Sequence, residues 1–214
     1  MNILMLQQHL DLEGKERPGC MIQAGRELAS RGHCVYVISG NSTPAQLLGD
    51  KKIGLLQKEG LAIIVMNIPY GSDMKPLDKG RYLVAYARKA LLQGRRLPRP
   101  DLIIASSPPL TAVAPAISLS RRFGAPLILE IREPWPEALI RRGALKHKTL
   151  IKLFRRLEQK AYAAAAAIVA LSPAVAGSLK KETACRGKIH IIDENQPESE
   201  RACRLIRVVE ELNH

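Results

Sequence analysis

The residues whose types best suit chemistry lie in two short polar segments, each directly after an apolar run. Ser106 and Ser107 follow the run 101–105, and Arg132 follows Leu127–Ile131. The planar arginine side chain donates two hydrogen bonds at once, a geometry that matches a phosphate group. Loops that follow strands of a parallel sheet are also where such folds bind ligands. We therefore expect Ser106, Ser107 and Arg132 to contact an anionic ligand.

Three further residues fit the same site, and each has an ordinary structural alternative. Glu130 is two residues from Arg132 and would share its face of the strand, so the pair is either a ligand site or a simple ion pair. Trp135 is the only tryptophan, and it either packs in the core or stacks against a ligand. His9 follows the first apolar run, as a solvated loop residue or as a ligand contact.

The loop 14–19 is a weaker candidate for phosphate binding. It has neither a GxGxxG pattern nor a Walker A pattern, because Glu16 stands where the latter needs Ser or Thr. Pro18 and Gly19 do open a predicted helix, whose backbone N–H groups could receive a phosphate. A tight structural turn is the alternative.

Nothing in the sequence predicts a metal or a cofactor. The four cysteines show no CxxC pair and no metal-ligand spacing, and we expect them to be free thiols. A nucleophile, base and acid in a recognisable arrangement are not visible either. The cysteines are Cys20, Cys34, Cys185 and Cys203.

The segments that must position the polar loops alternate between strand and helix patterns. Residues 101–105, Leu110–Phe123 and Leu127–Ile131 form a strand–helix–strand unit, which requires parallel strands. The prediction is a single α/β domain with a Rossmann-like, doubly wound, mainly parallel sheet of about seven strands. Residues 41–60 show no clear element, and 71–79 resemble a loop. The other expected strands are 2–8, 34–39, 61–69, 163–171 and 188–193, and the other helices are 21–30, 81–92, 173–181 and 197–213.

Charge is the outlying property of the 214 residues. Thirty-three Lys and Arg against twenty Asp and Glu give a net charge of +13, which indicates an anionic partner. Aromatic residues make up only 4%, which disfavours base stacking and hence a nucleic-acid partner. The N-terminus lacks a signal-peptide pattern and no apolar run reaches transmembrane length, which favours a cytoplasmic protein.

The segment 141–160 carries eight basic residues and one acidic residue. Leu150, Leu153, Phe154 and Leu157 form an apolar stripe along it, with Ile151 beside them. This is either an ordinary surface helix or a basic amphipathic helix that lies on an anionic membrane. The candidate membrane-binding residues are Arg141, Arg142, Lys146, Lys148, Lys152, Arg155, Arg156 and Lys160.

Four segments together resemble the N-terminal domain of family 4 retaining glycosyltransferases of the GT-B fold, in the branch that builds O-antigens, the outer part of lipopolysaccharide, and exopolysaccharides. They are RGHCVYV (31–37), RPDLIIASSPP (99–109), EIREPWPE (130–137) and the stretch from Leu157-Glu158 to ALSP (170–173). The resemblance covers residues 1–192 and implies one half of a GT-B fold. It also implies that the tail, 193–214, ends in a helix that packs back on this domain.

The resemblance assigns roles to the candidate residues. Arg132 and Glu133 become catalytic candidates, although the family has Asp where Glu133 stands, and Cys20-Met21 replace paired glycines that precede an Arg. A nucleotide sugar would be bound only through a donor domain that this sequence lacks. The acceptor would be lipid-linked or a saccharide, at the inner face of the plasma membrane. The alternative is a non-catalytic membrane-binding or regulatory module. Acceptor or phosphate contacts would come from His9, Pro18, Gly19, Ser106, Ser107, Glu130 and Trp135.

Overall fold

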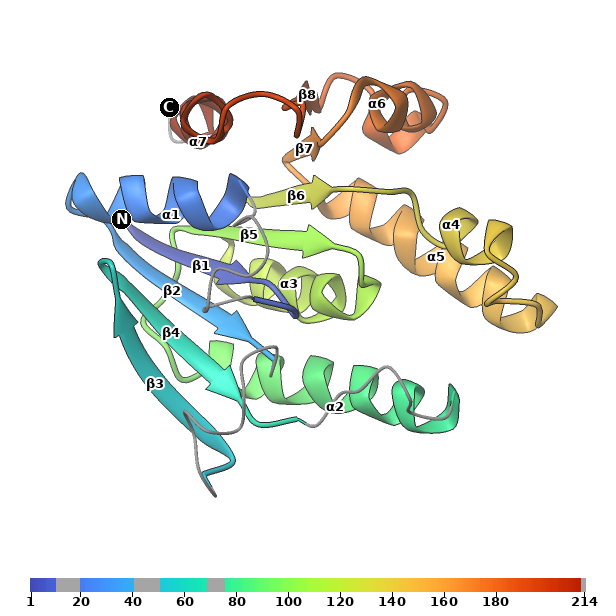
Figure 1. The fold of residues 1–214 in the computed structure, drawn as a ribbon, viewed down its shortest axis with the longest axis horizontal. Coiled ribbons are helices and arrows are strands. Elements are labelled where there is room, and N and C mark those ends of the chain that lie inside the picture. The colour runs from blue at the N-terminus through green and yellow to red at the C-terminus, as the bar shows by residue number, and fades with distance from the viewer. Residues whose placement is uncertain (11–19, 41–50, 69–75, 213–214) are drawn as a thin grey trace.

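The computed structural model describes residues 1–10, 20–40, 51–68 and 76–212, and in it one eight-stranded sheet lies between two layers of helices (Figure 1). The elements are β1 (Asn2–Leu6), α1 (Cys20–Ser30), β2 (Cys34–Ser39), β3 (Ile53–Lys58), β4 (Leu61–Met66), α2 (Pro76–Gly94), β5 (Leu102–Ser107), α3 (Leu110–Phe123), β6 (Leu127–Ile131), α4 (Glu137–Arg141), α5 (Lys148–Ala164), β7 (Ala167–Ala170), α6 (Pro173–Leu179), a 3₁₀ turn (Thr183–Cys185), β8 (Ile189–Ile191) and α7 (Glu198–Glu211).

The strand order is β3-β4-β2-β1-β5-β6-β7-β8, and every neighbouring pair is parallel except β3 with β4. The chain builds outward from β1 to β2 and β4, and then from β5 to β8 on the other side. The order therefore reverses between β1 and β5, which is the topological switch point of a doubly wound sheet. The predicted fold class is confirmed.

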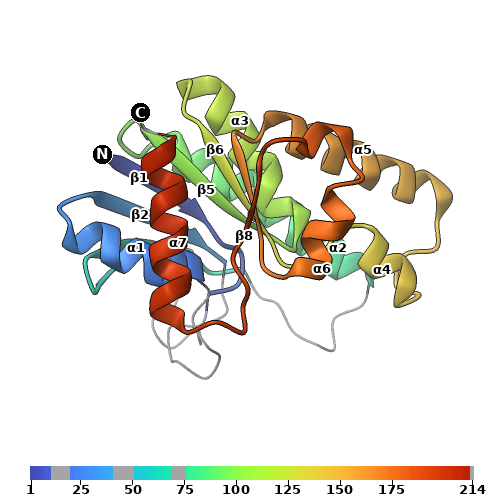
Figure 2. The ribbon, with the colours of Figure 1, turned by 90° about the horizontal axis from the view of Figure 1, so that it is seen from above.

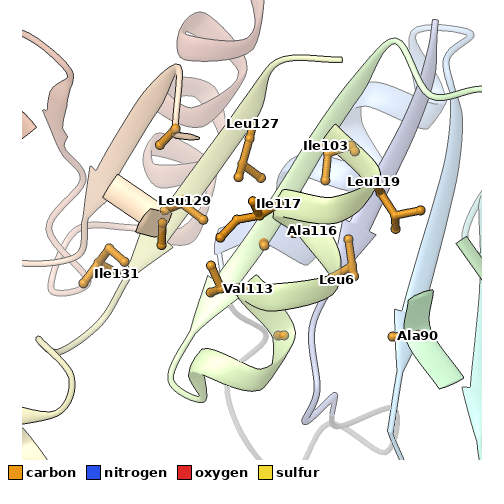
Figure 3. Packing of buried hydrophobic residues seen from close by; sticks show 14 of the residues in the cluster. Leu6, Ala90, Ile103, Val113, Ala116, Ile117, Leu119, Leu127, Leu129 and Ile131 are labelled. Carbon is orange, nitrogen blue, oxygen red and sulfur yellow. The ribbon is translucent and has the colours of Figure 1, made fainter. Parts of the chain in front are cut away.

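The central strands are buried on both faces, which explains their unbroken apolar runs. In β1, Leu4 and Leu6 face one core, and Ile3 and Met5 face the other. The first core lies under α2, α3 and α5, and Figure 3 shows the side chains of α3 against those of β5 and β6. The second core lies under α1 and α7.

Helix α7 lies across α1 on the second face of the sheet (Figures 1 and 2). Its apolar side is buried, with Leu205 fully inaccessible and Ile206 and Val209 at 2% exposure. Arg31 after α1 donates to Glu210 of α7 over 3.1 Å. The last helix of the chain is thus part of the domain's core.

Strand β3 was missed because it is an exposed edge strand. Ile53 and Leu55 are 36% and 63% exposed and no residue of the strand is fully buried, so the segment lacks the apolar run of a central strand. The turn to β4 is a two-residue hairpin in which Glu59 and Gly60 have φ of 52° and 79°. Positive φ at both positions is typical of a type I′ turn.

Several predicted boundaries are wrong. Helix α2 begins at Pro76, inside the predicted loop 71–79, and β4 ends at Met66. The segment 141–160 is not one helix, because α4 ends at Arg141 and α5 begins only at Lys148. Gly143, with φ of 68°, lies in the turn between them, a conformation that ends helices.

Candidate functional site

Two of the predicted polar segments meet at the carboxyl edge of the sheet, one strand from the switch point. Ser107 ends β5, Arg132 follows β6, and these strands are neighbours in the sheet. The backbone N–H of Arg132 donates to the carbonyl of Ser107 over 2.9 Å. The Arg132 side chain is exposed, whereas Ser107 is 1% exposed and therefore offers little of its hydroxyl to a ligand.

Glu130 and Arg132 lie in different surroundings. Glu130 is 2% exposed and is paired in register with Ser106 of β5. The Ser106 hydroxyl donates to Glu130 Oε1 over 3.1 Å. The half-buried Ser106 and the buried Glu130 thus pair within the sheet, while Arg132 follows in the loop beyond it.

Glu133 is bound to one of the predicted membrane-binding residues. Arg142 Nη2 lies 2.7 Å from Glu133 Oε2, and the Glu133 side chain keeps 22% of its exposure. This ion pair joins the loop after β6 to the end of α4. The structure thus places a catalytic candidate in contact with the basic segment.

Trp135 packs against the core rather than standing open at the edge. Its ring meets Phe154 of α5 edge to face, with 6.1 Å between centroids and 77° between planes. Its backbone N–H donates to Glu158 Oε1 over 3.0 Å. The indole Nε1 has no hydrogen-bond partner among the described residues.

The loop after β1 is fixed by neighbours on β2 and α2. His9 is exposed, and its ring stacks on Tyr82 at 6.2 Å and 19°. Gly40 N donates to Gln8 O over 2.9 Å. A Cβ on Gly40 would lie 2.8 Å from Gln8 O and 2.9 Å from Tyr82 Oη, so only glycine fits there. Pro18 and Gly19 lie outside the described residues.

The predicted apolar stripe of the basic segment is divided between core and solvent. Phe154 and Leu157 pack against the first core, while Leu150 and Leu153 are 44% and 57% exposed. All eight basic residues of the segment are exposed. Besides Arg142, Arg155 is paired, with Glu137 at 2.9 Å.

Glu158 is a site residue that the sequence reasoning missed. It is 7% exposed on α5, and it accepts a second hydrogen bond at Oε1 from the Tyr162 hydroxyl, over 2.6 Å. Burial raises the pKa of Glu158 from 4.5 to about 7, with nearby carboxylates adding to the rise and its hydrogen bonds opposing it. An acidic residue one turn after Phe154, on the buried side of an amphipathic helix, is the signal that was available.

The described residues contain no metal-ligand cluster and no membrane-spanning helix, and three of the cysteines are unpaired. Across the described ranges, no three His, Cys, Asp or Glu side chains are grouped closely enough to hold a metal ion. No described helix is long and apolar enough to cross a membrane. Cys34, Cys185 and Cys203 are free thiols.

The sequence matches the model of the glycosyl transferase 4-like domain over residues 22–193, well over half of the chain. This chain belongs to that family. No curated protein sequence matches it. The family agrees with the resemblance carried by the segments 130–137 and 157–173.

Several solved structures with a GT-B fold superpose on this chain. A sucrose-phosphate synthase unit from Thermosynechococcus elongatus, designated by the ranges 27–220 and 406–426, superposes with TM-score 0.63 at 12% identity, covering 100% of both chains. UGT89C1 of Arabidopsis thaliana gives TM-score 0.55 at 14% identity over 92% of this chain and 50% of its own. HepE of Anabaena with UDP-glucose gives 0.54 at 18% identity, over 90% and 43%. At these identities the likeness shows the fold.

The chain therefore spans about half the length of UGT89C1 and HepE. Its doubly wound sheet corresponds to one Rossmann-like half of a GT-B fold. The family and the fold together identify a domain of the sugar-transfer type.

Proposed function

We propose that this chain is the acceptor-side half of a GT-B glycosyltransferase. With a donor-binding domain, it would transfer a sugar from a nucleotide sugar to a lipid-linked or saccharide acceptor in cell-surface polysaccharide synthesis. The observation that carries the proposal is the exposed Arg132 at the carboxyl edge, beside the hydrogen-bonded pair of half-buried Ser106 and buried Glu130. In open α/β sheets, ligands bind in the crevice outside this edge.

The lengths of two similar solved structures support the assignment of this chain to one half of an enzyme. HepE, solved with UDP-glucose, is more than twice as long as the part that this chain covers. The sucrose-phosphate synthase unit is designated by two separated ranges, and this chain covers all of it. Helix α7, packed on α1, then corresponds to a returning C-terminal helix, with the donor domain supplied by another chain or by another part of the polypeptide.

Arg132 would face the cleft near both substrates, where its two parallel N–H donors would hold the phosphate of a lipid-phosphate acceptor and stabilise the diphosphate leaving group as negative charge develops there. The Gly19 loop, which follows Pro18 and opens a helix, would add backbone N–H groups to the same phosphates. Glu133 Oε2 is paired with Arg142. Its other oxygen, Oε1, would take the catalytic role that the family resemblance assigns to Glu133. Acceptor contacts would come from the exposed His9 and the half-buried Ser106 and Trp135. Ser107 and Glu130, 1% and 2% exposed, would support this edge from within the sheet.

A turnover assay tests this proposal. The purified chain is incubated with a panel of nucleotide sugars and with lipid-phosphate acceptors, and product is detected by mass spectrometry. We expect no transfer, because one wall of a cleft cannot hold donor and acceptor together. Robust turnover by the 214-residue chain would contradict its assignment as half of an enzyme.

We also propose that the chain is peripheral at the inner face of the plasma membrane, through one face of the sheet. Helices α2, α3 and α5 cover that face and carry eleven basic and two acidic residues. Helices α1 and α7, on the other face, carry four basic and five acidic residues. Charge is thus concentrated on one side, where it would attract anionic lipid.

Exposed apolar side chains lie on the same basic face. Val84 and Leu92 of α2 are 67% and 43% exposed, and Leu150 and Leu153 of α5 are similarly open. Among the described residues, neither α1 nor α7 has an exposed large apolar side chain. A basic face with apolar residues in it is typical of a surface that lies on a membrane.

Vesicle sedimentation tests the membrane proposal. We expect binding to vesicles that contain an acidic phospholipid, binding that weakens with salt. Changing Lys152, Arg155, Arg156 and Lys160 to Gln should weaken it more than tenfold, at roughly 1 kcal/mol per basic residue. An equally charged control changes Lys51, Lys52, Arg204 and Arg207, all exposed and outside α2, α3 and α5.

Equal loss in both variants would show that only net charge matters, and binding to neutral vesicles would move the contact elsewhere. Tighter binding to duplex DNA or RNA would favour a nucleic-acid partner instead.

A second candidate function is a non-catalytic membrane-binding or regulatory module. The pairing of Glu133 with Arg142 favours it, because a catalytic candidate is already occupied by the basic segment. In that case the vesicle result would stand, while supplying a donor domain would give no turnover.

A further inference from the structure

A cavity of about 490 Å³ lies between α4, α5 and α6, away from the loops after β1 and β5. Pro134, Ile140, Val175 and Leu179 give it apolar walls. A volume of this size is typical of small-molecule sites, which combine apolar walls with a few placed polar groups. Glu133 at the loop after β6 and Arg141 and Arg155 of the basic segment lie on its wall, but Glu158 takes part in neither the proposed transfer reaction nor the membrane contact.

The polar group best placed in this cavity is the carboxylate of Glu158. The residue lines the cavity and is 93% buried, since only 7% of it is exposed. Trp135 N–H and the Tyr162 hydroxyl both donate to Oε1, over 3.0 and 2.6 Å, and they fix the carboxylate. Oε2 of Glu158 accepts no hydrogen bond from the described residues, and it is not among the fully buried atoms that lack a partner. This oxygen can therefore accept a hydrogen bond from a ligand.

Two more carboxylates on the cavity wall each use one oxygen for a protein partner. Glu137 Oε1 accepts from Arg155 over 2.9 Å, and Glu182 Oε2 accepts from Gln159 over 2.6 Å. Both carboxylates disfavour a negative charge on Glu158 by Coulomb repulsion. A cation placed among the three would relieve this repulsion.

The cation that fits is organic rather than metallic. Among the described residues, no three carboxylate, His or Cys side chains are close enough to hold a metal ion. We propose that this cavity binds a small organic molecule through a protonated amine, which Glu158 Oε2 receives. The apolar walls would hold the carbon skeleton of that amine.

None of the basic side chains that line the cavity is paired with Glu158 Oε2 among the described residues. Arg155 is paired with Glu137, and the exposed Arg141 and Lys181 stand on α4 and just beyond α6. The titratable and charged groups that share the cavity wall with Glu158 are Glu133, Glu137, Arg141, Arg155, Tyr162, Lys181 and Glu182, and Cys185 beyond α6 also interacts with it electrostatically. The inference does not depend on the transfer reaction, so the two can fail separately.

Matched amines test the proposal. The full chain is titrated with ethanolamine, cadaverine and glucosamine, each against its fully N-acetylated counterpart (diacetylated for cadaverine), by calorimetry and by NMR shifts. We expect at least one amine to bind with saturation and its uncharged counterpart to bind at least tenfold more weakly. Equal binding of amine and amide, or no saturable binding of any amine, would overturn the proposal.

Two variants locate the site. Glu158→Gln keeps an oxygen for Trp135 and Tyr162 but removes the charge, so amine affinity should fall at least tenfold while thermal unfolding remains cooperative. Glu200→Gln on α7 is the control, because it removes an exposed acidic group from a helix that does not line the cavity. Undiminished affinity in Glu158→Gln would overturn the proposal.

The dependence of affinity on pH separates binding from a structural role of Glu158. Amine binding needs the ionised carboxylate, whose pKa is about 7. The affinity for ethanolamine and cadaverine, whose amines stay protonated over this range, should therefore rise roughly tenfold between pH 6 and pH 8. Glu158→Gln should abolish this rise, and a wild-type affinity that is flat over this range would contradict the assigned position.

Discussion

Replacing Glu158 by glutamine should remove a pH dependence of stability that this buried carboxyl creates. Its pKa is raised from 4.5 to about 7, chiefly by burial, so between these values the folded chain holds a proton that the unfolded chain releases. Stability must then fall as the pH rises from about 4.5 through about 7. At about 1.4 kcal/mol per pH unit, the gap corresponds to roughly 3 kcal/mol at pH 8.

The structure explains why glutamine is the right replacement. Its amide oxygen can still accept from Trp135 N–H and the Tyr162 hydroxyl, so the two hydrogen bonds at this position are kept. The variant should match the wild type near pH 4.5 and exceed it at pH 8, because it carries no charge to bury.

Urea unfolding of both proteins at pH 5, 6, 7 and 8 measures the effect. Subtracting the free energy of unfolding of the wild type from that of Glu158→Gln at each pH removes the contribution of the histidines and of the other groups that titrate in both proteins. We expect this difference to grow with pH and to level off above pH 8. A constant difference, or a variant that is less stable at pH 8, would refute the account of Glu158.

The remaining predictions concern the packing of the domain. Leu205→Ala, at a fully buried position of α7, should lower the free energy of unfolding by roughly 2–5 kcal/mol. Leu153→Ala, at a 57% exposed position, should change it by less than about 0.5 kcal/mol. Gly40→Ala should destabilise by roughly 1–3 kcal/mol, because its Cβ would meet Gln8 O. Gly80→Ala, with nothing within 4 Å in α2, should stabilise by roughly 0.5–1 kcal/mol. Urea unfolding measures all four, and equal effects within either pair would contradict the packing described.

The sequence predicted the central strands well because burial on both faces leaves a strong signal. Residues 102–105 and Leu127–Ile131 are apolar at nearly every position, and the helix between them implies parallel pairing. Edge strand β3 leaves no such signal, since Ile53 and Leu55 face solvent. Its hairpin turn at Glu59-Gly60 lacks the Asn-Gly or Asp-Gly pair that marks such turns most strongly.

The candidate site was only partly predictable. Polar residues after strands could be listed from the sequence, but the pairing of Ser106 with Glu130 depends on the register of β5 and β6. The pairing of Glu133 with Arg142 depends on the turn at Gly143, which the prediction of a single helix left out. Only tertiary packing buries Glu158, because a glutamate on a basic helix is normally exposed.

Comparing acceptor and donor binding tests most directly whether this chain is the acceptor side of a glycosyltransferase. The full chain is titrated by calorimetry with a short prenyl phosphate and with UDP-glucose, alongside Arg132→Gln and the exposed control Arg207→Gln. We predict saturable binding of the prenyl phosphate, at least tenfold weaker in Arg132→Gln and unchanged in Arg207→Gln, and no saturation with UDP-glucose. Saturable binding of UDP-glucose without binding of the prenyl phosphate, or prenyl phosphate binding that ignores Arg132, would contradict the acceptor-side assignment.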